Sequence, residues 1–179
     1  MLFRSAFGEL AATPPDGWLP ATYTLGAIYD TGGSDQYGPA DDRVSHYELY
    51  GMIDQAIVAS DAGDPVLGAF LRVSGSTQDR LNVVGLYADG GIAWYGPIAS
   101  RPDDVLGLAA SILRFTSDYR ARQQSVGTPV GAGETVLELT YQAAVMPWLV
   151  VQPDFQVLFD PPASRRTATA LGCQMVLVF

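Results

Sequence analysis

The chain has 179 residues, a length that favours one domain with a sizeable apolar core. All ten basic residues are arginines, and 19 acidic residues bring the net charge to −9. This balance argues against a nucleic-acid-binding protein, because contacts to the phosphate backbone need a basic face. Charged residues are only 16% of the chain and the mean hydropathy is +0.14, which is apolar for an acidic soluble protein.

Eight segments with apolar residues at every second position follow one another along the chain, separated by turn-forming residues. They span residues 21–32, 44–60, 65–75, 80–96, 104–115, 134–146, 148–159 and 167–179. Residues 1–10 look like the tail of a preceding strand. The polar stretch from Thr116 to Gly133 is expected to be a connection, because no segment shows the period of an amphipathic helix. The pattern predicts an all-β antiparallel fold with about eight visible strands.

Most of these segments have one apolar face and one polar face. In residues 44–60, Leu49 and Ile53 alternate with Glu48 and Asp54, and residues 134–146 show the same arrangement. Several segments reach the roughly 9 to 11 residues that a tilted strand needs to cross a bilayer, whereas soluble strands average about 5 to 6. No run of about 18 apolar residues and no export signal is visible. The lengths therefore favour a transmembrane β-barrel.

The connections alternate between longer and shorter, as in outer-membrane barrels, where the extracellular loops are the longer ones. Residues 31–43, 75–80, 116–133 and 160–166 are expected to be extracellular, and residues 60–64, 96–104 and 146–148 periplasmic. Four aromatic residues lie near the expected periplasmic ends, as an interfacial belt would: Trp18, Trp94, Tyr95 and Trp148. Local packing of aromatic residues beside turns is the alternative interpretation.

The last segment, residues 167–179, has apolar residues at every second position and is not followed by a polar tail. Its apolar positions are Leu171, Cys173, Met175, Leu177 and Phe179. A closed barrel pairs its last strand with its first, so such a segment leaves no exposed edge. The lone Cys173 permits neither an intramolecular disulfide nor a cysteine-based metal site, and is expected to act as a small apolar side chain.

Three stretches resemble the carbohydrate-selective porins of bacterial outer membranes, the OprB-type family: "YTLGAIYDTG", "GAFLRVSGSTQDRLNVVGLYADGGIAWYGPIASRPDDVLGLAASILR" and "VLELTYQAAVMPWLVVQPDFQVLFDP". The resemblance covers nearly the whole chain and matches the C-terminal half of the family. It implies that residues 1–179 are one porin domain of a barrel of about 16 strands, with the N-terminal half and the signal peptide missing. It also implies passive diffusion of monosaccharides or small oligosaccharides, without cofactor or catalysis.

The resemblance further implies an outer-membrane location, contact with lipid, and either a homotrimer or a monomer. The alternating terminal residues Met175, Leu177 and Phe179 resemble the signal by which the assembly machinery recognises barrel proteins.

The residues expected to face the channel carry aromatic rings for the apolar faces of sugars, Tyr95 among them, and charged or amide groups for their hydroxyls. The candidates for sugar contact are Arg72, Glu48, Tyr50, Tyr87, Asp89, Glu138, Gln142 and Asp154. Arg72 is the strongest candidate, because it lies in mid-strand between Leu71 and Val73. Its expected acidic neighbours are Glu48, Asp89 and Glu138. The alternative is that these side chains only hydrate the channel and pair with one another across strands.

Two other fold classes stay open: a small eight-stranded outer-membrane barrel with a structural or adhesion role, and a soluble lipocalin-like barrel with its apolar face inside. No catalytic site is predicted, since His46 is the only histidine and no nucleophile motif accompanies it. No metal site is predicted either, because the pairs Asp41–Asp42 and Asp103–Asp104 lie in turns, where aspartate commonly caps the backbone.

Overall fold

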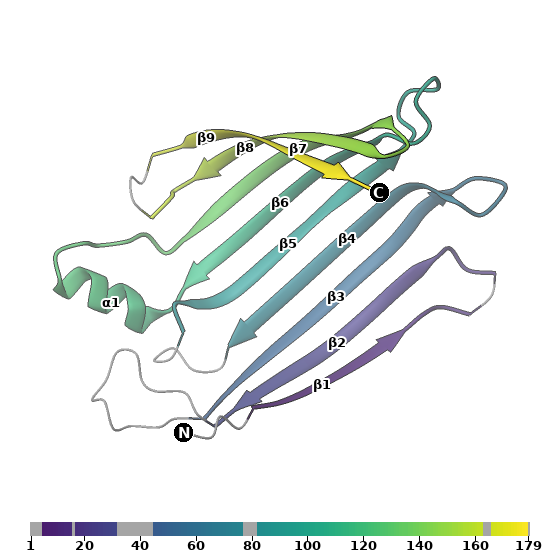
Figure 1. Cartoon of the computed structure of the whole chain (residues 1–179). Coiled ribbons are helices and arrows are strands. Elements are labelled where there is room, and N and C mark those ends of the chain that lie inside the picture. Colours follow the sequence, from purple (N-terminus) through teal and green to yellow (C-terminus); the bar gives the residue numbers. More distant parts are fainter. Residues whose placement is uncertain (1–4, 16, 32–44, 77–81, 163–165, 179) are drawn as a thin grey trace.

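The computed structural model describes residues 5–15, 17–31, 45–76, 82–162 and 166–178. Within these residues the chain forms one antiparallel sheet of nine strands, and each strand pairs with the next one along the chain (Figure 1). The strands are β1 Ser5–Ala12, β2 Ala21–Asp30, β3 His46–Ala59, β4 Pro65–Ser76, β5 Val84–Tyr95, β6 Val105–Phe115, β7 Gly133–Met146, β8 Leu149–Phe159 and β9 Ala168–Leu177.

The eight predicted strands are confirmed as β2 to β9, with ends that differ by a few residues. Residues 1–10 were expected to contain only the tail of a strand, but β1 pairs with β2 along all of its eight residues. The longest strands, β3 and β7, have 14 residues each, more than the roughly 9 to 11 needed to cross a bilayer at a tilt.

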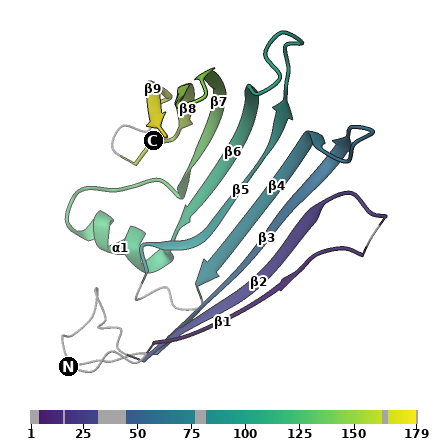
Figure 2. The same ribbon diagram turned by 45° about the vertical axis from the view of Figure 1, so that its right-hand side comes forward.

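The sheet is strongly curved, as Figure 2 shows, and in the described residues it is open, with β1 and β9 as its edges. A single layer has no second layer to cover its apolar side chains. Accordingly, the one apolar side chain that is buried among the described residues is Ala56. Large apolar side chains such as Leu49 and Leu139 are about half exposed. Such a surface is stable only against another apolar medium.

The expectation of no helix was wrong in the connection between β6 and β7, where α1 spans Ser117–Ser125. The hydroxyl of Thr116 accepts a hydrogen bond from the backbone N–H of Tyr119, 3.4 Å away, and so caps the first turn. The ring of Tyr119 packs against Phe115, with ring centroids 5.3 Å apart. Because this helix is short and has no apolar stripe, its period could not be recognised in the sequence. Among the described residues, no helix is long and apolar enough to cross a membrane.

The connections β2–β3, β4–β5, β6–β7 and β8–β9 lie at one end of the sheet, and the other four lie at the opposite end (Figures 1 and 2). We call these the long-connection end and the short-connection end. The predicted grouping of the connections at two ends is therefore confirmed, and α1 belongs to the long-connection end. The alternation in length holds only in part, because the β5–β6 connection is longer than the β4–β5 and β8–β9 connections.

Candidate functional site

The strand register gives the sheet one polar face. Arg72 on β4 lies opposite Met52 on β3 and Asp89 on β5, and Asp89 lies opposite Ser111 on β6. All eight side chains proposed from the sequence fall on this face: Glu48 and Tyr50 on β3, Arg72 on β4, Tyr87 and Asp89 on β5, Glu138 and Gln142 on β7, and Asp154 on β8. We call it the polar face.

The opposite, apolar face is formed by the alternate residues. Leu139 on β7, for example, lies between Leu108 on β6 and Phe155 on β8, and all three are exposed. Among the described strand residues, the one side chain on this face that is charged at neutral pH is Arg114, next to the long-connection end. A broad, uncharged and exposed apolar surface is the pattern of a lipid-facing barrel wall.

Arg72 is held by Asp89 from the next strand. Its Nε donates to both carboxylate oxygens of Asp89 at 3.1 Å, and its Nη2 donates to Oδ2. The guanidinium carbon also lies 5.0 Å from the centre of the Phe70 ring, within the range of a cation–π contact. The Asp89 side chain is only 8% exposed, whereas that of Arg72 is 53% exposed. Asp89 therefore orients Arg72, and Arg72 is the member of the pair that solutes can reach.

Tyr50 is oriented by a residue two strands away. Its hydroxyl donates to the carboxylate of Glu9 on β1, so the ring must pass over β2. It passes at Gly26, where an added Cβ would lie 2.1 Å from the tyrosine Cζ. Phe7 on β1 stacks on the same ring with centroids 6.3 Å apart. The missing side chain at Gly26 is thus what lets Tyr50 lie flat along the wall.

A second polar group lies farther along the sheet. The Nε2 of Gln156 donates to Glu138 at 2.8 Å and to Asp154 at 3.2 Å, which links β7 to β8. Gln142 lies on the same face opposite Val105. The predicted side chains therefore form two groups, one on β3 to β5 and one on β7 and β8.

The first group surrounds a cavity of about 300 Å³, whose lining includes Glu48, Tyr50, Arg72, Ser74 and Tyr87. A further cavity of about 430 Å³ shares Glu48, Ser74 and Tyr87 with it and extends to Asn82, toward the long-connection end. Together they form a recess with carboxylate, guanidinium, hydroxyl and aromatic groups in its walls. This recess is the candidate functional site.

Sequence reasoning missed Ser74, Glu9 and Gly26. The alternation already places Ser74 on the same side as Arg72, two residues away, so its role in the lining was within reach. The role of Glu9 and Gly26 was not, because it depends on a side chain that crosses a whole strand. The expectation that Glu138 is a neighbour of Arg72 was wrong, because β5 and β6 lie between the strands that carry these two residues.

The aromatic residues of the expected belt lie at the short-connection end, as predicted from the sequence. Trp18, Trp94 and Trp148 are exposed there. Of the two positions expected for Tyr95, the structure shows the one on the polar face, because its ring lies 3.5 Å from the position that a Cβ on Gly68 would take. Its ring therefore does not belong to the apolar face, where a belt residue would lie.

On β9, Met175 and Leu177 lie opposite Val151 and Leu149 on the apolar face. Cys173 is on the same face and is exposed and free. Phe179 lies outside the described residues.

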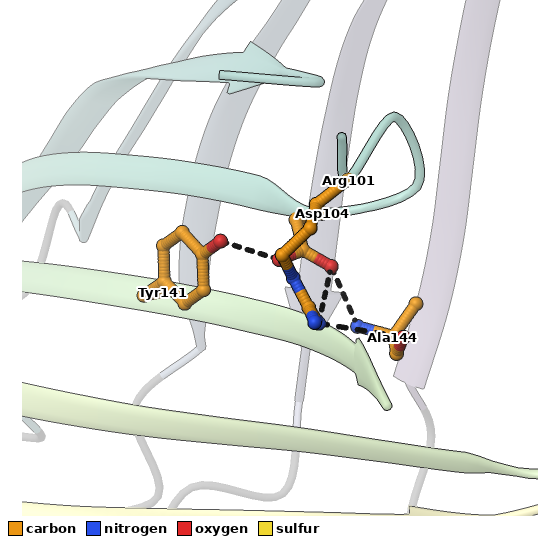
Figure 3. A network of polar contacts seen from close by, with 4 residues as sticks. All are labelled: Arg101, Asp104, Tyr141 and Ala144. Carbon is orange, nitrogen blue, oxygen red and sulfur yellow. Dashed lines mark hydrogen bonds and ion pairs between the residues drawn. The ribbon is translucent and has the colours of Figure 1, made fainter. Parts of the chain in front are cut away.

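At the short-connection end, Asp104 joins the β5–β6 connection to β7 (Figure 3). Its carboxylate accepts hydrogen bonds from Arg101, from the hydroxyl of Tyr141 and from the backbone N–H of Ala144, the last at 3.0 Å. The hydrogen bonds from Arg101, and then those from Tyr141 and Ala144, lower the pKa of Asp104 to about 2, while the same pairing raises the pKa of Arg101. The Asp104 carboxylate thus attaches the β5–β6 connection to β7 through its hydrogen bonds. Separately, no cluster of metal-binding side chains occurs in the described ranges.

Comparison with known proteins matches residues 5–179 to the model of the carbohydrate-selective porin, OprB family. The chain is 29% identical to Porin B of Pseudomonas aeruginosa over 189 aligned positions, which cover 90% of this chain and 42% of Porin B. It is 22% identical to the putative porin QuiX of Acinetobacter baylyi, covering 90% of this chain and 41% of QuiX.

Among solved structures, the high-pH form of Pseudomonas putida OprB superposes with a TM-score of 0.75 at 23% identity, over 94% of this chain and 46% of that protein. The low-pH form gives a TM-score of 0.66 at 19% identity, over 97% of this chain and 46% of that protein. The fold is thus shared with a solved porin, and the chain spans less than half the length of these relatives. The chain belongs to the OprB family of carbohydrate-selective porins, which are outer-membrane proteins.

Proposed function

We propose that this chain forms part of the wall of an outer-membrane channel through which carbohydrates diffuse passively. The observation that carries the proposal is the separation of the two faces: among the described strand residues, charged side chains gather on one face across the sheet, and the other face is apolar and has one charged side chain, Arg114. Lipid contacts the side chains of the apolar face, and water in the channel solvates those of the polar face.

The same observations disfavour the other two fold classes. A small barrel closed by this chain alone would pair its first and last strands, but β1 and β9 are the edges of the sheet. A lipocalin-like barrel would bury the apolar face, which is here the more exposed one. We propose that residues 1–179 contribute one portion of a single, larger β-barrel domain, because an open sheet edge cannot persist in lipid.

Within this channel, we assign sugar contact to the recess on β3 to β5. Pyranose rings present apolar C–H faces and a rim of hydroxyls, so they need aromatic faces together with donors and acceptors. Tyr50 and Tyr87 offer rings, Glu48 offers acceptors, and Arg72 offers a fork of donors whose orientation Asp89 fixes. Asp89 then serves as a positioning residue. Glu138, Gln142 and Asp154 supply further polar contacts along the wall.

The proposal is tested with the purified full-length protein in lipid vesicles, by measuring vesicle swelling in sugars of increasing size. We expect swelling in monosaccharides such as glucose and a steep decrease as the oligosaccharide grows. Protein-free vesicles give the baseline. Swelling in glucose no faster than this baseline, with the protein folded, would overturn the proposal.

We also propose that the barrel assembly machinery recognises Met175 and Leu177 on β9 together with Phe179. Met175 and Leu177 are 71% and 52% exposed on the apolar face, which leaves them accessible for recognition. Leu177→Asp should reduce the amount of assembled protein at the cell surface. Gln174→Asp, on the opposite face of β9, is the matched control, and equal losses from both variants would contradict this role.

A further inference from the structure

The polar face is strongly acidic. Among the described strand residues it carries eight carboxylates and one arginine, Arg72. The carboxylates are Glu9, Asp30, Glu48, Asp54, Asp89, Glu134, Glu138 and Asp154. They come from six of the nine strands, so the negative charge is spread along the wall rather than gathered at one point.

Among the described residues, positive charge on the polar face is paired, and the other positive charges lie elsewhere. Arg72 forms an ion pair with Asp89, so that pair adds no net charge. Arg101 is in the β5–β6 connection and is paired with Asp104, while Arg114 is on the apolar face. The other described arginines, Arg120, Arg122 and Arg166, lie on α1 or in the β8–β9 connection. Leaving Asp89 and Asp30 aside, six carboxylates on the polar face are thus not offset by an arginine of that face.

We infer that the channel sorts carbohydrates by charge, passing neutral sugars and cationic amino sugars in preference to acidic sugars. This inference rests on the proposed channel function. Fixed charge of one sign along a confined aqueous path attracts solutes of opposite sign and repels solutes of the same sign, as carboxylate rings do in cation channels. A local potential of about one kT already raises the concentration of a monovalent cation about threefold and lowers that of an anion equally.

The test compares three sugars that share one ring size: glucose, glucosamine and glucuronate. Their influx into vesicles containing the full-length protein is measured chemically, with potassium and valinomycin present so that no voltage builds up. At about 10 mM salt, where the Debye length is roughly 30 Å, we expect glucosamine to enter at least about threefold faster than glucuronate. At about 1 M salt, where the Debye length is roughly 3 Å, the difference should largely disappear.

The outcomes separate the two proposals. If none of the three sugars enters, the channel function itself fails. If glucose enters while glucosamine and glucuronate enter at equal rates in low salt, the channel function stands and the charge inference is overturned.

A pair of variants assigns the effect to this wall. Asp54→Asn combined with Glu134→Gln removes two charges from the polar face, at positions outside the proposed sugar-contact set. Asp61→Asn combined with Asp64→Asn removes two charges from the exposed β3–β4 connection. We expect the glucosamine-to-glucuronate ratio to fall in the first variant and to stay unchanged in the second, with glucose influx retained in both. An unchanged ratio in the first variant, with its heat-modifiable folded band intact, would overturn the inference.

Discussion

The hydroxyl of Tyr50 on β3 donates a hydrogen bond to the carboxylate of Glu9 on β1, although β2 lies between the two strands. The contact is possible because the tyrosine ring lies over Gly26, where β2 presents no side chain. It fixes one aromatic wall of the recess and ties the edge strand to the third strand. Gly26 therefore influences the site without touching a solute.

Gly26→Ala should displace Tyr50, because the new Cβ would lie 2.1 Å from the tyrosine Cζ. The ring has room to swing away, so the expected cost is the lost hydrogen bond and ring contact, about 1 to 2 kcal/mol of unfolding free energy. Urea unfolding in phospholipid vesicles, followed by tryptophan fluorescence, measures it. Gly8→Ala on β1 is the control, because an added Cβ there meets no atom within 4 Å. Equal effects from the two variants would contradict the role of Gly26.

The strands could be predicted from the sequence because the two environments of a barrel wall impose a period of two on every strand. The same period placed all eight candidate side chains on one face. What could not be predicted are contacts that depend on side-chain direction across strands, such as Tyr50 with Glu9. Helix α1 was also missed, because it is stabilised by the cap at Thr116 and one aromatic contact rather than by an apolar stripe.

The second prediction concerns the hydrogen bonds by which Asp104 holds the β5–β6 connection against β7. Asp104→Asn keeps an acceptor for the Ala144 N–H but loses the charge that pairs with Arg101. We expect a lower urea midpoint for this variant. Asp103→Asn removes the same charge from the neighbouring exposed position and should change the midpoint much less. Equal midpoints for both variants would show that the network in Figure 3 does not stabilise the fold.

The pH dependence follows from the pKa of Asp104, which is lowered from 3.8 to about 2 by its hydrogen bonds. A carboxyl group with a lowered folded-state pKa stabilises the fold above its unfolded-state pKa, and this stabilisation is lost as the pH falls through the folded-state pKa. The stability difference between the wild type and Asp104→Asn should therefore stay constant above about pH 5. It should shrink as the pH falls from 3.8 toward 2, and a difference that grows on acidification would contradict this assignment.

The assignment of the two faces is tested by neighbouring residues on β7. Leu139→Arg places a charge on the apolar face between Leu108 and Phe155, which should cost about 2 to 4 kcal/mol near the membrane midplane. Glu138→Arg places the same side chain on the polar face, where water solvates it, although it loses the bond to Gln156. The amount of heat-resistant folded barrel on a gel should drop far more for Leu139→Arg. Similar losses would mean that the faces are assigned incorrectly.

Arg72 is the residue by which sugar contact can be separated from charge balance. Its Nε and Nη2 are bonded to a nearly buried Asp89, while half of its side chain surface is exposed toward the recess. Arg72→Ala leaves Asp89 without this partner, so it lowers stability whatever the role of Arg72 in transport. The double variant Arg72→Ala with Asp89→Ala removes this secondary effect and is the proper background for functional measurements.

The measurement is the block of ion current by glucose in a planar bilayer containing the full-length protein. If the guanidinium binds sugar hydroxyls, the double variant should bind glucose more weakly by about 1 to 3 kcal/mol, the scale of hydrogen bonds to a charged group. Arg72→Lys keeps the charge but lacks the planar fork, so it should retain the ion selectivity of the wild type while glucose block becomes weaker. A half-blocking glucose concentration that is the same in the wild type, Arg72→Lys and the double variant would show that Arg72 only balances the charge of Asp89.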